Sequence, residues 1–125
     1  MAKLDPVAAP AGPVVTGLAD GGFVVGAQRF PDGLLLTPDE ARAWAAPPLA
    51  TLAAEHLASV LAIRPEFLLL GTGATLIRPP AALAVALEAR GTGLEAMDSR
   101  AAARAWGVLR GEGRVIAAAL YPLAA

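Results

Sequence analysis

The feature that most constrains the fold is an apolar run that ends at two glycines, FLLLGTG over residues 67–73. Such a run is typical of a strand buried on both faces, and the glycines predict a tight loop at its carboxyl end. A similar transition follows at residues 93–100, where apolar GLEAM runs into polar DSR. Two transitions of this kind favour an α/β sheet with a crevice where the strands end.

Composition limits the classes of protein to which the chain can belong. Its 125 residues correspond to one domain, and 56% of them are hydrophobic against 17% charged, which argues against disorder. A net charge of −1 argues against nucleic-acid binding. The chain has no cysteine, and its single histidine, His56, excludes a metal centre built on paired histidines. We therefore expect neither a metal nor a cofactor.

The apolar stretch over residues 67–87 does not predict membrane insertion, because glycines, Arg78 and two prolines interrupt it. Asp5 and several prolines lie where a signal peptide needs an apolar core, so we expect a cytoplasmic protein. Residues 1–20 are rich in proline, alanine and glycine and predict an extended, partly ordered arm, which can dock on the sheet edge through its two valines. Residues 21–125 are expected to form a single α/β domain.

The first half of the domain predicts a β-hairpin followed by helices. The apolar runs at 21–28 and 33–36 flank the turn residues Phe30-Pro31-Asp32-Gly33, which favours a hairpin. Thr37-Pro38-Asp39-Glu40 has the pattern of a helix start, and Pro47 would end that helix after Trp44. Residues 53–62 have helical spacing of apolar positions and predict a second helix.

The second half predicts alternating strands and helices after the strand at 67–70. Pro79 and Pro80 open a helix whose Leu83 and Leu87 lie one turn apart. A second buried strand over 93–97, a helix capped by Asp98 or Ser99, and a strand over 114–121 complete the domain. This alternation predicts a sheet covered by helices on both faces.

The loop Gly71-Thr72-Gly73 has two interpretations. Its backbone N–H groups could approach an anion or ligand, with Arg78 and Arg100 supplying positive charge near the strand ends. Alternatively, the glycines only permit a sharp turn and the arginines are solvated. The match to a dinucleotide-binding pattern is poor, because Leu76 stands where a third glycine is needed.

Other polar residues are better explained as structural than as catalytic. Glu95 interrupts an apolar strand, and a buried carboxylate there would need a partner such as an arginine. Asp98 is read first as a helix cap. Neither Ser59 nor Ser99 lies in a nucleophile motif, so no catalytic set can be assembled. Trp44 and Trp106 suit core or interface anchors.

Several segments in order resemble a family of small α/β domains of largely unknown function. This family includes bacterial stand-alone proteins, the mitochondrial NADH dehydrogenase (complex I) assembly factor three and the adipogenesis-associated domain protein. The segments that carry the resemblance are GGFVVG at 21–26, GLLLTP at 33–38, LLLGTG at 68–73, GLEAMDSRAAARAW at 93–106 and EGRVIAAALYPL at 112–123.

The resemblance implies three layers, with a mixed central sheet flanked by helices and an additional β-hairpin. It also implies a cleft around Gly71-Thr72-Gly73, Met97, Asp98 and Arg100. One departure concerns this cleft: relatives often have a tyrosine–asparagine pair in the last helix, and this chain has Trp106-Gly107. If that pair supplies polar groups to a site, the site is altered or absent here.

Three functions are compatible with these observations. The resemblance implies a non-catalytic binding protein that assists the assembly or stability of a respiratory (NADH dehydrogenase) complex, with respiratory-complex subunits or other proteins as partners. The alternative is a domain, either a binding module or an enzyme, that binds a small molecule or anion through the Gly71–Gly73 loop and nearby arginines. The third is a self-associating module that forms a homodimer.

Overall fold

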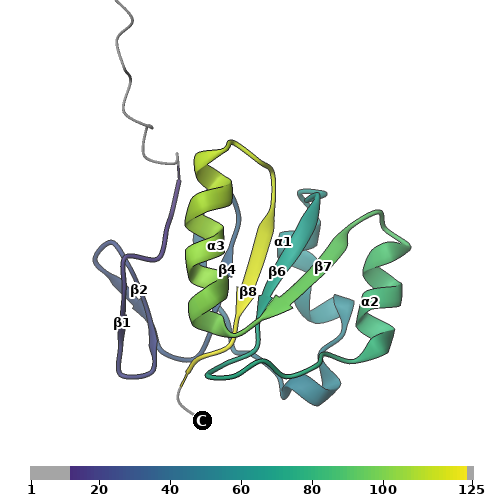
Figure 1. Cartoon of the computed structure of the whole chain (residues 1–125), viewed down its shortest axis with the longest axis horizontal. Coiled ribbons are helices and arrows are strands. Elements are labelled where there is room, and N and C mark those ends of the chain that lie inside the picture. Colours follow the sequence, from purple (N-terminus) through teal and green to yellow (C-terminus); the bar gives the residue numbers. More distant parts are fainter. Residues whose placement is uncertain (1–11, 124–125) are drawn as a thin grey trace, which may run out of the picture.

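A mixed five-stranded sheet forms the centre of the molecule (Figure 1). The computed structural model describes residues 12–123. The strands lie in the order β5-β4-β8-β6-β7, and β6 pairs in parallel with both β7 and β8, whereas β4 is antiparallel to β8 and to β5. Their bounds are Leu34–Leu36 for β4, Ala41–Ala43 for β5, Phe67–Gly71 for β6, Gly93–Met97 for β7 and Ala117–Leu120 for β8.

Helices cover both faces of this sheet, as the sequence predicts. The helix α3 (Ser99–Gly111) packs on one face, and α1 (Ala58–Leu61) and α2 (Ala81–Glu88) pack on the other (Figure 1). Two 3₁₀ turns, Leu49–Thr51 and Ala54–Leu57, precede α1. The three-layer α/β class is therefore confirmed, and the helix expected over 53–62 is replaced by a 3₁₀ turn and a single α-helical turn.

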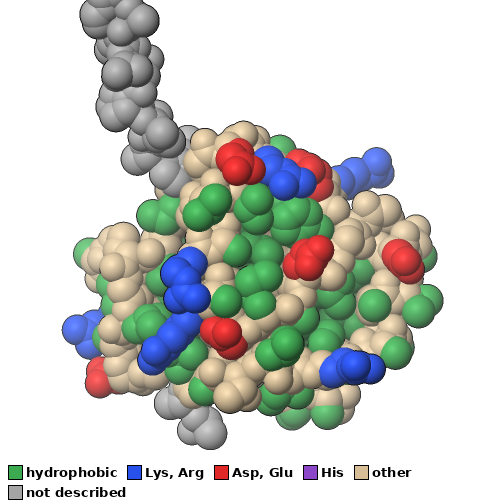
Figure 2. All heavy atoms as spheres, in the orientation of Figure 1, with side chains coloured by type: hydrophobic (Ala, Val, Ile, Leu, Met, Phe, Trp, Pro, Cys, Tyr) green, Lys and Arg blue, Asp and Glu red, His purple; other side chains and the backbone are tan. Residues whose placement is uncertain are grey.

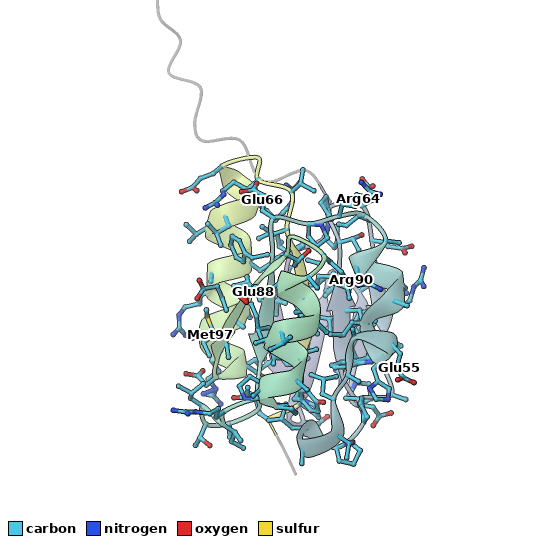
Figure 3. The ribbon with its side chains drawn as sticks, turned by 90° about the vertical axis from the view of Figure 1, so that its right-hand side faces the viewer. Glu55, Arg64, Glu66, Glu88, Arg90 and Met97 are labelled. Atoms are coloured by element: carbon cyan, nitrogen blue, oxygen red, sulfur yellow. The ribbon has the colours of Figure 1, made fainter. Side chains whose placement is uncertain are left out.

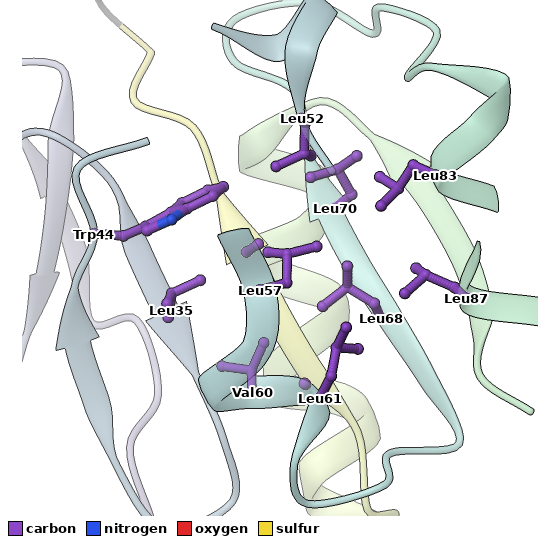
Figure 4. Packing of buried hydrophobic residues seen from close by; sticks show 12 residues of the cluster. Leu35, Trp44, Leu52, Leu57, Val60, Leu61, Leu68, Leu70, Leu83 and Leu87 are labelled. Atoms are coloured by element: carbon purple, nitrogen blue, oxygen red, sulfur yellow. The ribbon is translucent and has the colours of Figure 1, made fainter. Parts of the chain in front are cut away.

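The apolar strand β6 divides the core into two clusters. Leu68 and Leu70 enter the cluster beneath α1 and α2, and Leu69 enters the cluster beneath α3. Figure 4 shows the first cluster, in which leucines from the sheet, α1 and α2 meet. Successive side chains of a strand point to opposite faces, so a strand between two helical layers must be apolar throughout.

The additional β-structure differs from the predicted hairpin. A separate antiparallel sheet contains β1 (Gly17–Ala19), β2 (Gly22–Val25) and β3 (Gln28–Phe30). The run at 33–36 was expected as the second arm of the hairpin, and this is wrong, because Leu34–Leu36 instead joins the central sheet between β8 and β5. The turn between β2 and β3 is at Gly26, where φ is +60°.

The predicted helix after Thr37 is also wrong. The Thr37 hydroxyl oxygen accepts hydrogen bonds from the N–H groups of Asp39 and Glu40, at 3.3 and 3.2 Å, as a capping threonine would. The chain nevertheless turns back as β5, because the Thr37 N–H bonds to the Glu40 carbonyl oxygen at 3.0 Å and closes a hairpin. Pairing of β5 with β4 continues to Ala43, and the next residue, Trp44, is buried in the core.

The structure also bears on the predicted elements of the second half, on the N-terminal arm and on membrane insertion. The helix after Pro80, the helix after Asp98 and the final strand are confirmed, with the final strand shortened to 117–120. The arm expected over 1–20 lies outside the described residues as far as residue 11, and Val14 and Val15 pack against the cluster beneath α3. No helix in the described part of the chain is long and apolar enough to cross a membrane.

Candidate functional site

The structure brings the predicted cleft residues to one edge of the sheet. Gly71 lies opposite Met97 of β7 and Leu120 of β8, so all three parallel strands end there. The chain leaves β6 toward α2 on one face and leaves β7 toward α3 on the other. This divergence is the topological switch point at which α/β sheets commonly bind ligands.

Two N–H groups of the glycine loop already donate hydrogen bonds within the protein. The Thr72 N–H donates to the Met97 carbonyl oxygen, and the Gly73 N–H donates to the Ser99 hydroxyl oxygen, both at 2.9 Å. The Thr72 hydroxyl donates to the Thr75 carbonyl oxygen at 2.7 Å and accepts from the Ile77 N–H at 3.0 Å. The geometry thus accounts for the loop as a tight turn, and its role as a cleft stays a prediction.

Ser99 closes the crevice between the strand ends, and the sequence did not single it out for this role. Its side chain is fully buried, and its hydroxyl donates to the Tyr121 carbonyl oxygen at 2.7 Å while accepting from Gly73. A Cβ atom on Gly71 would lie 2.7 Å from this hydroxyl oxygen, so glycine is needed there for close packing. The only indication of this role in the sequence is that a small polar residue follows Asp98.

The residues of the β7 end have mainly structural contacts. Asp98 is the N-cap of α3, and its Oδ1 accepts a hydrogen bond from the Ala101 N–H at 2.9 Å, as predicted. Met97 is half-buried against the cluster beneath α3. Glu95 was expected to be buried and paired, which is wrong: β7 is an edge strand, so Glu95 is exposed and has no ion pair within residues 12–123.

The two predicted arginines do not share a cavity with the glycine loop. Arg100 lines a hollow of about 240 Å³ between α3 and the segment that leads into β1, together with Arg104. Arg78 is exposed in the segment before α2. Neither side chain has a partner among the residues that the structure describes.

An open groove lies on the other side of the glycine loop. Its volume is about 570 Å³, and Thr72, Tyr121 and the Pro47-Pro48-Leu49 segment contribute to its walls. The Tyr121 ring packs edge-on against Trp44 at a centroid distance of 5.1 Å. Its hydroxyl group is buried with no hydrogen-bond partner in the described chain, and burial raises the pKa of Tyr121 to about 12. Sequence reasoning did not select this residue.

Large apolar side chains are exposed on and before α2. Leu76 and Ile77, in the segment that leads into the helix, are 63% and 52% exposed, and Val85 on its outer face is 66% exposed. Figure 2 shows hydrophobic side chains on this side of the molecule, to the right. Trp44, which the sequence suggested as a core or interface anchor, is buried in the core.

Residues 12–123 contain no cluster of histidine, aspartate or glutamate able to hold a metal ion.

Comparison with known protein families identifies the family of this chain. A family model described as a protein of unknown function (DUF498/DUF598) matches residues 15–121. The chain belongs to this family. The match begins just before β1 and ends just after β8, so it contains both sheets and all three helices.

Similar proteins agree with this family and its fold. An uncharacterized protein of Rhodobacter capsulatus is 37% identical over 98% of this chain and 94% of its own length. A crystal structure from Bordetella parapertussis has a TM-score of 0.80 at 34% identity and covers 94% of this chain and 99% of that one. A Mth938-like domain from Bordetella pertussis has a TM-score of 0.80 at 29% identity, covering 97% and 92%. The chain thus has the Mth938-like fold.

Proposed function

We propose that this chain is a non-catalytic, cytoplasmic protein-binding domain that assists the assembly or stability of a respiratory (NADH dehydrogenase) complex. The observation that carries the binding function is the exposed apolar surface of α2 and the segment before it. Leu83 and Leu87 hold one side of α2 in the core, and Val85 faces outward. The helix contains one charged residue, Glu88, at its end.

An amphipathic surface helix normally presents polar residues to water. The outer side of α2 presents Val85 and alanines instead, with Leu76 and Ile77 close by in sequence. Exposed large apolar side chains gathered on one element and its approach are typical of protein interaction sites. The resemblance described above, to a family that includes a complex I assembly factor, supports respiratory-complex subunits as the partners.

The test is affinity capture from the source cell in mild detergent, comparing two exposed valines. Val85→Asp places a charge on the α2 surface, and Val108→Asp makes the same change on α3, where the exposed fraction of the side chain is nearly equal at 64%. We expect the wild-type chain and Val108→Asp to capture respiratory-complex subunits and Val85→Asp to lose them.

Capture of no such subunit by a folded wild-type chain contradicts the respiratory function. Equal capture by Val85→Asp and the wild type contradicts the assignment of the surface. If the chain recovers only itself, self-association replaces the proposal, and analytical ultracentrifugation then measures the dimer.

A further inference from the structure

A cavity with two arginines lies at the opposite end of the sheet from the glycine loop. It has a volume of about 420 Å³ and lies where α1 and α2 end, beside the segments that lead into β6 and β7. Leu61 and Ala62 form its apolar side, and Arg64, Arg90 and Thr92 supply its polar groups. A volume of this size suits a small ligand.

Both arginines have free donors. Neither Arg64 nor Arg90 makes a side-chain hydrogen bond or ion pair within residues 12–123. Arg114, by contrast, donates to the carboxylate of Glu66 at 3.0 Å. Glu66, two residues after Arg64 in the chain, is therefore paired with a different arginine. Each guanidinium carries five N–H donors and no acceptor.

No acidic residue lines the cavity. In the view of Figure 3, Arg64 and Arg90 lie to the right, whereas Glu66 and Glu88 lie to the left. Glu55 is on the same side as the arginines but farther down, and it is not among the residues that line the cavity. The lining of the cavity therefore carries two positively charged side chains and no negatively charged one.

The backbone holds Arg64 in an unusual conformation. Its φ is +54°, in the left-handed region, although a residue before proline normally adopts an extended conformation. The Arg64 N–H donates to the Leu61 carbonyl oxygen at 3.0 Å, and the Thr92 hydroxyl donates to the Pro65 carbonyl oxygen at 3.1 Å. The first bond closes the turn that contains Arg64, and the second ties this turn to the segment that contains Arg90 and Thr92. Strained backbone that is held in this way is frequent at binding sites.

We propose that the cavity binds a phosphate group between the guanidinium groups of Arg64 and Arg90. A guanidinium presents its donors in a planar fork that matches two phosphate oxygens, and two such forks suit a dianion. The apolar wall leaves room for the part of the ligand that carries the phosphate. That carrier is either a free phosphorylated compound or the headgroup of an anionic lipid.

The test titrates inorganic phosphate into ¹⁵N-labelled full-length protein at constant ionic strength, with chloride as the reference anion. We expect saturable amide shifts confined to Ala62, Arg64, Arg90 and Thr92. Arg90→Gln removes one charged donor and is expected to weaken binding about tenfold or more. Arg104→Gln, an equal charge change at an exposed residue on α3, is expected to leave binding unchanged.

A second arm identifies the source of the phosphate. Flotation with vesicles of phosphatidylcholine alone and of phosphatidylcholine mixed with phosphatidylglycerol measures headgroup binding. Arg90-dependent flotation with the anionic vesicles supports a lipid, and phosphate binding without flotation supports a free compound. Absence of saturable shifts and of flotation, or equal loss in Arg90→Gln and Arg104→Gln, overturns the proposal. Because the capture experiment uses the α2 surface and this one uses the arginine cavity, either result stands without the other.

Discussion

The indole N–H of Trp106 donates a hydrogen bond to the carbonyl oxygen of Pro13, 2.9 Å away and 93 residues earlier in the chain. Trp106 belongs to α3 and is fully buried in the cluster beneath this helix, and Val14 and Val15, which follow Pro13, pack against the same cluster. The residue that departs from the family pattern therefore lies in the core. There it fixes the segment that leads into β1.

Trp106→Phe tests this attachment. Phenylalanine keeps an aromatic ring but loses the N–H donor, so the segment around Pro13 should detach more often. We expect the free energy of unfolding to fall by about 1 to 2 kcal/mol. Hydrogen exchange at residues 14–18 should rise by more than in the rest of the sheet. Trp44→Phe is the control, since Trp44 packs in the other cluster, and faster exchange of the same segment in both variants would contradict the attachment.

Ser99→Ala tests the closure at the strand ends. The change removes a hydroxyl that accepts from the Gly73 N–H and donates to the Tyr121 carbonyl oxygen. Two polar groups at the ends of β6 and β8 would then lack partners, and we expect a loss of about 2 to 4 kcal/mol in denaturant unfolding. Ser59→Ala, at an exposed serine on α1, should change stability little. A Ser99→Ala variant as stable as the wild type would mean that water replaces the hydroxyl.

Tyr121 makes the free energy of unfolding decrease at alkaline pH. Burial raises its pKa from 10.0 to about 12 in the folded state. Between these values the unfolded chain binds fewer protons than the folded chain, so the stabilisation is complete below pH 10 and is lost as pH rises through 12. It is the only tyrosine, so its absorbance at alkaline pH reports this residue alone. A midpoint near 10 in the folded protein would contradict the burial of its hydroxyl.

Glu95 lies at the centre of an open edge strand. Gly93 and Met97 bond toward β6, so the N–H and C=O groups of Leu94 and Ala96 point away from the sheet. Two copies that paired antiparallel through all these groups would place Glu95 opposite Glu95, where like charges repel. We expect Glu95→Val to associate with itself more strongly in sedimentation equilibrium. Glu112→Val, with the same charge change at an exposed site away from β7, should behave as the wild type.

The elements with strong local signals were predictable from the sequence. Pro80 before α2, the Asp98 cap of α3 and the apolar run of β6 each determine their structure through neighbours within a few residues. Leu34–Leu36 was misassigned because its sheet partner is distant: Leu34 lies opposite Leu120. The capping pattern at Thr37 formed its expected hydrogen bonds, but residues 41–43 pair with Leu34–Leu36 as a strand and do not continue as a helix.

The groups of residues in the cavities were less predictable. Gly71, Met97 and Asp98 were correctly placed at one edge, because parallel strands end together. The roles of Ser99 and Tyr121 were not predicted, because they depend on contacts between segments more than 20 residues apart. Arg64 and Arg90 follow two different helices, and nothing in the spacing of the sequence indicates that they line the same cavity.

The contact between Gly71 and Ser99 bears on how sequences of this family can change. A Cβ at position 71 would collide with the Ser99 hydroxyl and with Leu120, whose Cδ2 would lie 2.8 Å away. The Ser99 Cα would lie 2.9 Å from the same Cβ, so no change of side chain at 99 would make room for a larger residue at 71. Position 71 is therefore closed to every residue but glycine unless the backbone of the strand end shifts.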